Sequence, residues 1–262
     1  MELDKVLFVI VLFEQNLKRS RAFQSLLPLS TEHVFVYDNS AAPCPDVPDS
    51  ISYCHDCSNP GVSRAYNKAF LFAEERGFEF VLLMDQDSFF PRETLESYRH
   101  AVASYPHIHV FAPIAHDGRH VYSPFHLVNG HGKQMHKPKA GIYSLKRMSV
   151  INSGLMVSVH AYKQSGGYDE SFPLDFSDID FCERLGNNQF DICIIDGVIL
   201  HNHSSAGKIS RSRFDSYLKA LVRFKKLSRQ HVAYWSALPR AIKLSIQWRD
   251  SWFLARLFKG PV

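Results

Sequence analysis

The sequence predicts an α/β fold, a mostly parallel sheet flanked by helices, followed by a helical C-terminal extension. The first 115 residues alternate short apolar runs with helix-like segments, as βαβ units do. From Ser210 the apolar residues take up helical spacing instead. The charge changes at the same place, because residues 1–207 hold 17 basic and 24 acidic side chains while residues 208–262 hold 13 and 2. We therefore expect two domains, 1–207 and 208–262.

Each element of the first half has a local signal. Apolar runs predict four buried strands, at 5–13, 33–37, 51–54 and 78–84. Small and apolar residues at a spacing of 3.6 predict a helix over 60–76, with Gly77 at its C-cap. Pro91 suits the first position of a helix over 92–104.

The second half is less regular. Residues 116–149 are rich in His, Lys, Gly and Pro, and we expect short strands and mobile loops that contact substrate. The pattern then predicts a strand at 149–159, a short helix, a helix at 179–185 and a strand at 192–200. In the extension we expect one helix from Ser210 and a second from Pro239 to about Phe258.

The early apolar run at 6–13 is too short to cross a membrane and lacks the basic flank of a signal peptide. Five cysteines, an odd number without regular spacing, fit reduced thiols better than a disulfide framework. Both observations favour a cytoplasmic protein.

The sequence Asp85-Gln86-Asp87 follows a predicted buried strand. Ligand sites of open α/β sheets lie at the carboxyl ends of the strands, and paired carboxylates there suit a hard divalent cation. The alternative is a strand end followed by a helix cap.

A second polar group is expected at the same edge of the sheet. Asp38 ends another strand, and residues 59–67 open the following helix. An aspartate there can accept hydrogen bonds from a base or ribose, Gly61 permits close backbone approach, and Arg64 can meet phosphate. Together these residues can hold a nucleoside diphosphate, although each alone would also suit a turn or cap.

The segment 166–184 combines many carboxylates with aromatic residues. Aromatic neighbours bury part of the acidic groups, and a carboxylate in such a place has a shifted proton affinity and can act as a general base. Asp175, Asp178 and Glu183 are among these carboxylates, and Asp178 could instead only cap the following helix.

In their order along residues 5–203, the motifs resemble the inverting glycosyltransferases of family 2, which have the GT-A fold, and among them the rhamnosyltransferase-like branch. Besides the first apolar strand, the motifs are Asp38-Asn39-Ser40, Asn59-x-Gly61 with Asn67, Asp85-Gln86-Asp87-Ser88, Ile151-Asn152-Ser153-Gly154, Gly167-Tyr168-Asp169-Glu170, Asp178-Ile179-Asp180-Phe181-Cys182-x-Arg184 and His201-Asn202-His203.

The resemblance implies a role for each matching residue. Asp38 would bind the nucleobase, and Asp85 and Asp87 would bind ribose and Mg²⁺ or Mn²⁺, with Asp87 the direct ligand. Asp178 would be the catalytic base. His201 or His203 would complete the metal or diphosphate site; spacing does not choose between them, and we favour His203. The remaining nucleotide-sugar contacts would be Asn59, Gly61, Arg64 and Asn67.

Two positions depart from the family pattern. Ser177-Asp178 stands where the family commonly has Glu-Asp, which leaves Asp180 or Asp175 as possible substitutes for the base. Phe13-Glu14 replaces a frequent tyrosine-asparagine pair after the first strand, which puts nucleotide contacts at that edge in doubt.

By this resemblance the chain would be a metal-dependent hexosyltransferase. It would move a sugar, with rhamnose the candidate, from a nucleotide-diphosphate donor to a glycan or lipid-linked glycan acceptor in surface polysaccharide synthesis. The alternative, suggested by Ser177, is a catalytically silent nucleotide-sugar-binding or scaffold protein of the same fold.

The basic, tryptophan-containing extension suits helices lying on an anionic membrane surface, so we expect a peripheral protein on the inner face of the cell membrane. Docking onto the acidic body is the competing interpretation. Nucleic acid is not expected as a partner, because no recognition motif accompanies the basic residues.

Overall fold

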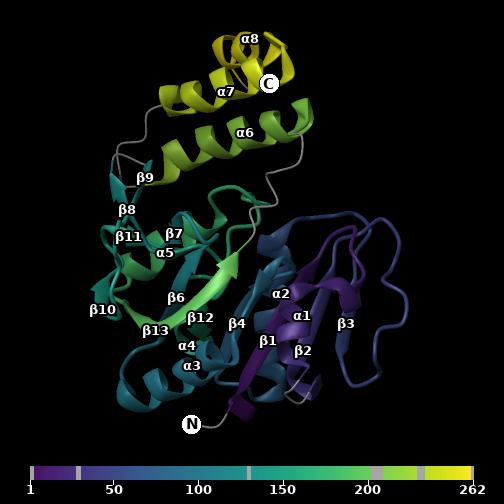
Figure 1. The fold of residues 1–262 in the computed structure, drawn as a ribbon, viewed down its shortest axis with the longest axis vertical. Helices are drawn as coiled ribbons and strands as arrows, with labels where there is room; N and C mark the ends of the chain where they lie inside the picture. Colours follow the sequence, from purple (N-terminus) through teal and green to yellow (C-terminus); the bar gives the residue numbers. More distant parts are fainter. Residues whose placement is uncertain (1–2, 28–30, 129–130, 202–208, 229–233, 261–262) are drawn as a thin grey trace.

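A ten-stranded sheet runs through the body of the protein, and four of its strands, β1 to β4, are parallel. The computed structural model describes residues 3–27, 31–128, 131–201, 209–228 and 234–260 (Figure 1). The main path of the sheet is β10-β13-β6-β12-β4-β1-β2-β3, in which β12 and β10 run antiparallel to their neighbours. Its strands are β1 (Val6–Leu12), β2 (Val34–Asp38), β3 (Ser52–His55), β4 (Phe80–Asp85), β6 (Val110–His116), β10 (Gly141–Ser144), β12 (Met156–Ser158) and β13 (Asp191–His201), with β5 (Ser88–Phe89) paired to β13 and β7 (Val121–Ser123) to β6.

Helices cover both faces of this sheet, which explains why its central strands are apolar throughout. Every residue of β1 is buried, and its side chains alternate between two cores. One core includes α2 (Val62–Arg76), α4 (Val159–Gln164) and α5 (Ser177–Asn187), and the other includes α1 (Arg21–Leu26) and α3 (Arg92–Ser104). Short 3₁₀ turns, η1 (Leu3–Lys5), η2 (Leu17–Arg19) and η3 (Thr31–His33), precede three of these elements.

The elements of the first half lie where the sequence predicts them, within one or two residues. Gly77 ends α2 in the left-handed conformation, with φ of 75°, and its amide donates to the carbonyl groups of Ala73 and Glu74. Pro91 is the N-cap of α3, one residue before the first helical position that we expected.

The single strand predicted at 149–159 is wrong. The segment forms β11 (Met148–Ser149) and β12, separated by a connection that lies at the site described below. Gly154 interrupts the strand because it has φ of 87° and packs against Pro113, so the backbone turns there. As expected, residues 116–149 contain short strands. Of these, β8 (Phe125–Val128) and β9 (His131–Gln134) form a second, three-stranded sheet with β11.

The extension contains α6 (Arg211–Leu227), a short 3₁₀ turn η5 (Tyr234–Ala237), α7 (Leu238–Trp248) and α8 (Trp252–Lys259). The one long second helix that we predicted is therefore wrong. Arg249 adopts a left-handed conformation with φ of 52° that closes α7, and Asp250 accepts a hydrogen bond from the Trp252 amide at the start of α8. These helices share a hydrophobic core of their own.

The extension docks on the body at its acidic segment. Phe172 of the body is fully buried in the core of the extension, and Phe176 stacks on Phe224 with ring centres 5.1 Å apart. Arg213 pairs with Asp175 and Arg223 with Asp169, so basic helices meet acidic residues. The three helices stand over one end of the sheet (Figure 1). None of the described helices combines the length and apolarity that a membrane span requires.

Candidate active site

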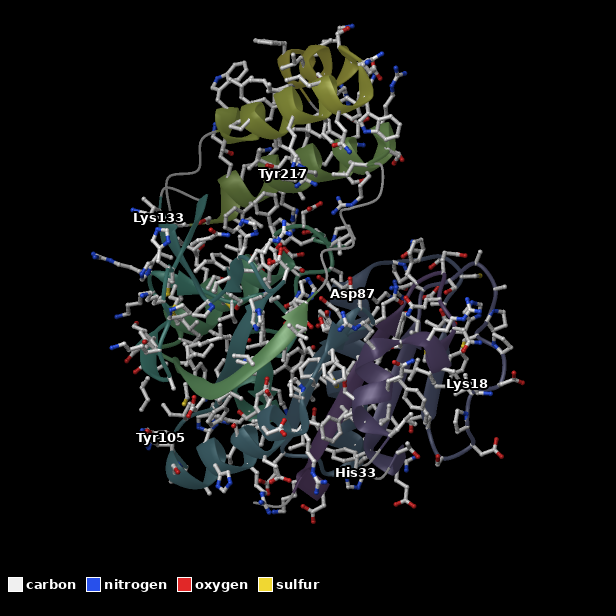
Figure 2. All side chains as sticks on the ribbon, viewed as in Figure 1. Lys18, His33, Asp87, Tyr105, Lys133 and Tyr217 are labelled. Atoms are coloured by element: carbon white, nitrogen blue, oxygen red, sulfur yellow. The ribbon has the colours of Figure 1, made fainter. Side chains whose placement is uncertain are left out.

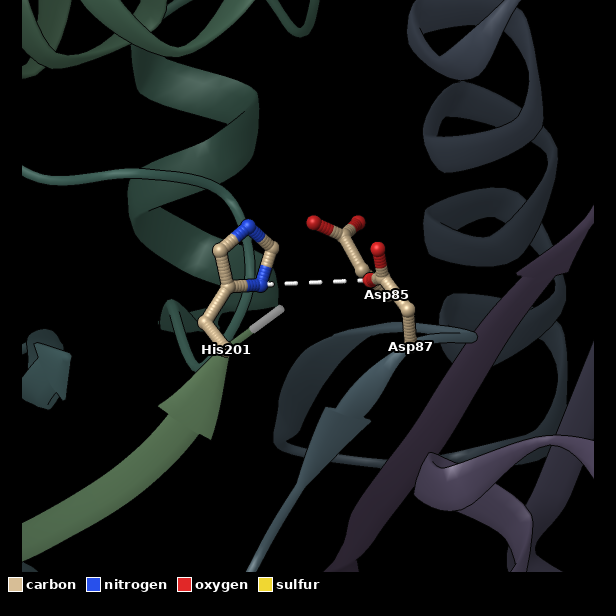
Figure 3. Close-up of side chains that lie close together, drawn as sticks. All are labelled: Asp85, Asp87 and His201. Carbon is tan, nitrogen blue, oxygen red and sulfur yellow. Dashed lines mark ion pairs between the residues drawn. The ribbon is translucent and has the colours of Figure 1, made fainter. Parts of the chain in front are cut away.

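Three potential metal ligands converge at the end of the sheet that faces the extension (Figures 2 and 3). Asp85 ends β4, Asp87 lies in the turn before β5, and His201 ends β13. The pairing of β5 with β13 places Ser88 opposite His201, which brings the histidine beside both aspartates. The ligand atoms of the three residues lie within 4.8 Å of one another, and Asp87 Oδ1 is 3.9 Å from His201 Nδ1. His203, which we favoured as the ligand, lies outside the described residues.

Two serines fix this arrangement from behind. Ser88 Oγ lies 2.7 Å from His201 Nδ1, and Ser153 donates a hydrogen bond of 2.7 Å to Ser88. Ser153 also accepts a hydrogen bond from the Asp85 amide, so one short network connects β4, β5, β13 and the 150–155 connection. When His201 donates its Nδ1 proton to Ser88, Nε2 carries the lone pair that a metal ligand needs.

Burial, and secondly the charge of Asp87, raise the pKa of Asp85 to about 7. A divalent cation among the three side chains would offset this repulsion. The two carboxylates suit Mg²⁺ or Mn²⁺, and the imidazole favours the transition metal Mn²⁺, so the residues fit a metal that the sequence led us to expect.

Asp178 lies in the first turn of α5, where its Oδ1 accepts a hydrogen bond of 2.8 Å from the Ile179 amide. It is not the N-cap, because Phe176 holds that position with φ of 66°. Burial raises the pKa of Asp178 to about 7. The hydrogen bonds from the backbone lower this pKa, and the negative charges of Asp175 and Asp85 raise it. Asp178 lines a cavity of about 660 Å³ together with Asp85 and His201.

The two alternative bases are engaged with cations. Asp175 lines the same cavity but pairs with Arg213. Asp180 pairs with Arg184, with Nη2 2.7 Å from its Oδ2, and does not line the cavity. The geometry therefore favours Asp178 over both.

Ser177, the departure from the family pattern, has a packing role. It is buried, donates to the Leu174 carbonyl and accepts a hydrogen bond of 3.1 Å from Asn152, which also lines the cavity. The Oδ1 atom of Asn152 in turn accepts a hydrogen bond from the Tyr168 hydroxyl. The serine thus joins α5 to the 150–155 connection without adding a second charge beside Asp178.

Asp38 is completely buried and organises the loop that follows it. Its oxygens accept hydrogen bonds from the Ser40 and Cys44 amides and, at 2.6 Å, from the Tyr53 hydroxyl. Burial opposes ionisation, but these hydrogen bonds outweigh it and hold the pKa of Asp38 below its usual value. The side chain is enclosed by its own loop in this structure.

The residues expected at the start of α2 have different surroundings. Asn59 and Arg64 are exposed. Gly61, with φ of 96°, makes a close approach to Pro173 of the chain itself, and the Val62 amide donates to the Pro173 carbonyl. Asn67 uses its whole amide internally, accepting from Tyr162 and the Tyr168 amide and donating to the Tyr168 carbonyl and Glu170. We therefore do not retain Asn67 among the nucleotide contacts.

The extension contributes side chains to the cavity, and no motif in the sequence indicates which ones. Arg213 of α6 and Arg240 and Lys243 of α7 line it together with the carboxylates, and both arginines lie beside Asp175. The high content of Lys and Arg in the extension indicates that cations are available there. Only the packing of α6 and α7 shows which of these side chains line the cavity.

Comparison with known proteins relates this fold to sugar transferases. No family model matches the sequence. A dTDP-rhamnosyl transferase, RfbF of Shigella flexneri, is 26% identical over 200 residues, which are 74% of this chain and 64% of that protein, so the chain spans less than two thirds of this relative.

Two solved structures agree in fold. TarS of S. aureus matches with a TM-score of 0.54 and 15% identity over 86% of this chain and 44% of its own. GalNAc-T7, solved with UDP, GalNAc and Mn²⁺, matches with a TM-score of 0.65 and 10% identity over 96% of this chain and 56% of its own. The predicted GT-A fold is confirmed.

Proposed function

We propose that this chain transfers a sugar from a nucleotide-diphosphate donor to a glycan or lipid-linked glycan acceptor. The premise is that it has the GT-A fold and resembles the family 2 glycosyltransferases, and a dTDP-rhamnosyl transferase in particular. Rhamnose is the candidate sugar, and surface polysaccharide the product. The observation that carries the proposal is the cavity in which Asp178 lies with Asp85 and His201.

The proposed reaction is one displacement. The acceptor oxygen attacks the anomeric carbon, the bond to the nucleoside diphosphate breaks with its electron pair, and Asp178 takes the proton of the acceptor hydroxyl. Attack opposite the leaving group inverts the configuration at that carbon. Asp178 suits this role because its pKa of about 7 is matched to proton transfer near neutral pH.

Asp85, Asp87 and His201 would hold Mg²⁺ or Mn²⁺. The cation would offset the negative charge that develops on the departing diphosphate. Asp38 would act on the nucleobase side through the loop at 39–44 that it organises, with Asn59, Gly61 and Arg64 at the neighbouring edge. The exposed aromatic residues and basic charge of the extension support peripheral association with the inner face of the cell membrane.

Nucleotide release from a panel of donors tests the proposal. The panel consists of dTDP-rhamnose, UDP-galactose, UDP-N-acetylglucosamine and GDP-mannose, each with Mg²⁺ or Mn²⁺. We expect slow hydrolysis of one donor, dependent on the metal and abolished by Asp87→Ala. Binding of a donor without any release, with or without added glycan acceptors, would instead support the catalytically silent alternative.

A further inference from the structure

The side-chain amide of Gln86, the residue between Asp85 and Asp87, bonds to the end of β1. Its Oε1 accepts a hydrogen bond of 2.9 Å from the Phe13 amide, and its Nε2 donates one of 3.2 Å to the Phe13 carbonyl. Phe13 is the first residue after β1, and the last backbone pair of β1 with β4 is Val11 with Asp85. The two bonds therefore continue the attachment of β1 to the acidic motif beyond the end of the sheet pairing.

The next residue, Glu14, connects this point to the loop that follows β2. Glu14 adopts a left-handed conformation, with φ of 49°, which turns the chain toward that loop. Its amide donates a hydrogen bond of 2.8 Å to Ser40 Oγ, and its Oε1 accepts one of 3.0 Å from the Ala41 amide. The Ser40 amide in turn donates to Asp38, which organises the loop at 39–44. Glu14, part of a departure from the family pattern, thus holds this loop from the side of β1.

The backbone of the acidic motif is anchored independently of the Gln86 side chain. The Gln86 carbonyl accepts hydrogen bonds from the Arg21 amide, at 2.9 Å, and from Ser20 Oγ, at 3.1 Å, at the start of α1. Loss of the side-chain amide would therefore release Phe13 while the two aspartates of the motif stay in place. The metal ligands and the loop after β2 thus depend on Gln86 in different ways.

We propose that Gln86 and Glu14 are positioning residues, which together hold the loop at 39–44 beside the acidic motif in the conformation that receives a nucleobase. Gln86 fixes Phe13, and Glu14 transmits this fixed position to the loop. A loop that is already ordered binds more tightly, because less conformational entropy is lost on binding. This inference rests on the proposed function, which assigns the nucleobase side of the donor to this loop.

Nucleotide binding to Gln86→Met tests the proposal. Methionine keeps the length of the side chain but forms neither hydrogen bond to Phe13. With dTDP and UDP as probes, each titrated calorimetrically with Mn²⁺, we expect the affinity for the nucleotide that binds to fall about three- to tenfold. Binding of Mn²⁺ alone, measured by electron paramagnetic resonance of the free ion, should be nearly unchanged, because the Gln86 carbonyl remains anchored at α1. An unchanged nucleotide affinity, or an equal loss of Mn²⁺ affinity, would overturn the proposal.

Glu14 provides a second test, through a double-mutant cycle. Glu14→Met removes the acceptor of the Ala41 amide and should weaken nucleotide binding as Gln86→Met does, whereas Glu14→Gln keeps that oxygen and should restore most of the affinity. Both variants lose the same charge, so they differ in this hydrogen bond. Because Gln86 and Glu14 act in series, the double methionine variant should lose little more affinity than either single one. Additive losses would show that the two residues act independently and would contradict the proposal.

Gln24→Met is the matched control. Gln24 is exposed and also donates from its side-chain amide to a backbone carbonyl, that of Lys18, at 3.0 Å. Lys18 lies in the turn η2 before α1, so the same substitution there removes a similar bond at a different place. We expect Gln24→Met to bind dTDP, UDP and Mn²⁺ as the unaltered protein does. A loss of nucleotide affinity equal to that of Gln86→Met would overturn the proposal.

Hydrogen exchange in the free protein separates this inference from the proposed function. Without any nucleotide, the amides of residues 39–44 should exchange severalfold faster in Gln86→Met than in Gln24→Met, because the loop is held less firmly. If exchange rises but neither nucleotide binds, Gln86 supports the loop, and its role toward a nucleobase fails with the proposed function. If a donor is turned over while exchange and nucleotide affinity are unchanged in Gln86→Met, the inference is wrong and the transferase stands.

Discussion

At Asp178, the burial that raises the pKa of the carboxyl to about 7 also costs folding free energy whenever the group is ionised. The ordinary pKa is 3.8, so between about pH 4 and 7 the folded protein binds more protons than the unfolded chain. The contribution of this carboxyl to stability is therefore present at low pH and lost as the pH rises through 7. If Asp178 is the base that we propose, its fitness for neutral pH is obtained at the expense of stability.

Asp178→Asn tests both consequences in one variant. An asparagine keeps the oxygen that accepts from the Ile179 amide but cannot take a proton, so sugar transfer should fall below detection while nucleotide binding is retained. At pH 8 the variant should be more stable by about 1–3 kcal/mol in urea denaturation, and at pH 4 the difference should vanish. Retained transfer would exclude Asp178 as the base, and a variant less stable at pH 8 would contradict its burial as an anion.

His201 and His203 provide a second test, which asks which of the two histidines is the metal ligand. We expect His201→Asn to weaken Mn²⁺ binding at least tenfold, because it removes one of three converging ligands. His203→Asn is the control and should bind Mn²⁺ as the unaltered protein does, measured by electron paramagnetic resonance of the free ion. The opposite pattern would return the role of ligand to His203, as the sequence led us to expect.

The position of a side chain could be predicted from the sequence where a motif alone places it at the edge of the sheet, as with Asp85 and Asp87. Residue roles could not be predicted where a role depends on contacts between distant segments. Asn67 shows this, since its amide is used by Tyr162, Tyr168 and Glu170, about a hundred residues away. Arg240 and Lys243 are the opposite case. No motif in the sequence indicates that they lie at the cavity, because only the packing of α7 brings them there.

At the scale of elements, the start of α2 and the segment before α5 are built against each other. The Val62 amide and the Ser63 hydroxyl donate to the carbonyl groups of Pro173 and Phe172. Both contacts need Gly61, whose φ of 96° brings the backbone next to Pro173. The helix start thus supports the segment that carries the proposed base five residues later.

Gly61→Ala should therefore disturb both stability and activity. The added methyl group would overlap the Pro173 carbonyl, and we expect a loss of about 2–4 kcal/mol in urea denaturation together with reduced transfer. Gly77→Ala is the matched control, since Gly77 also has a positive φ but an added Cβ meets nothing within 4 Å. Its cost should stay near 1 kcal/mol, with transfer unchanged. Equal losses in both variants would show that backbone strain alone matters at Gly61.

Elements were predictable where one periodicity runs without interruption, as in β1, α2 and α3. The boundaries of elements were predicted wrongly where a turn lies within an apolar segment. The run at 149–159 continues through Gly154, and the apolar spacing after Pro239 continues through Arg249, although both residues have positive φ. A left-handed arginine leaves no signal in a hydrophobic pattern, whereas a glycine such as Gly154 gives a weak one.

Over the whole molecule, the opposite charges of the two regions meet in the structure. The extension docks on the acidic segment through Phe172 and through the pairs Arg213–Asp175 and Arg223–Asp169. Docking, one of the two interpretations of the basic extension, thus accounts for part of its charge. Its outer surface still presents Trp235 and Phe258, which are 53% and 70% exposed and lie with ring centres 5.4 Å apart.

This outer aromatic pair is the expected membrane contact. We predict sedimentation with anionic vesicles at low salt, weakened as salt screens the basic charge. Phe258→Ser should reduce this binding severalfold, because an aromatic side chain no longer enters the interface. Phe23→Leu, a conservative change in the core of the body, is the control and should sediment normally. An absence of sedimentation at low salt would reject membrane association.

The burial of Phe172 among the C-terminal helices limits how this chain can be recombined with others of the same fold. A chimera joined at residue 207 would separate that ring from the helices that enclose it and Asp175 from its arginine. The C-terminal helices and the loop that carries the proposed base therefore form one structural unit, although they are distant in sequence. An exchange of the extension between proteins of this fold requires residues 169–183 to be moved with it.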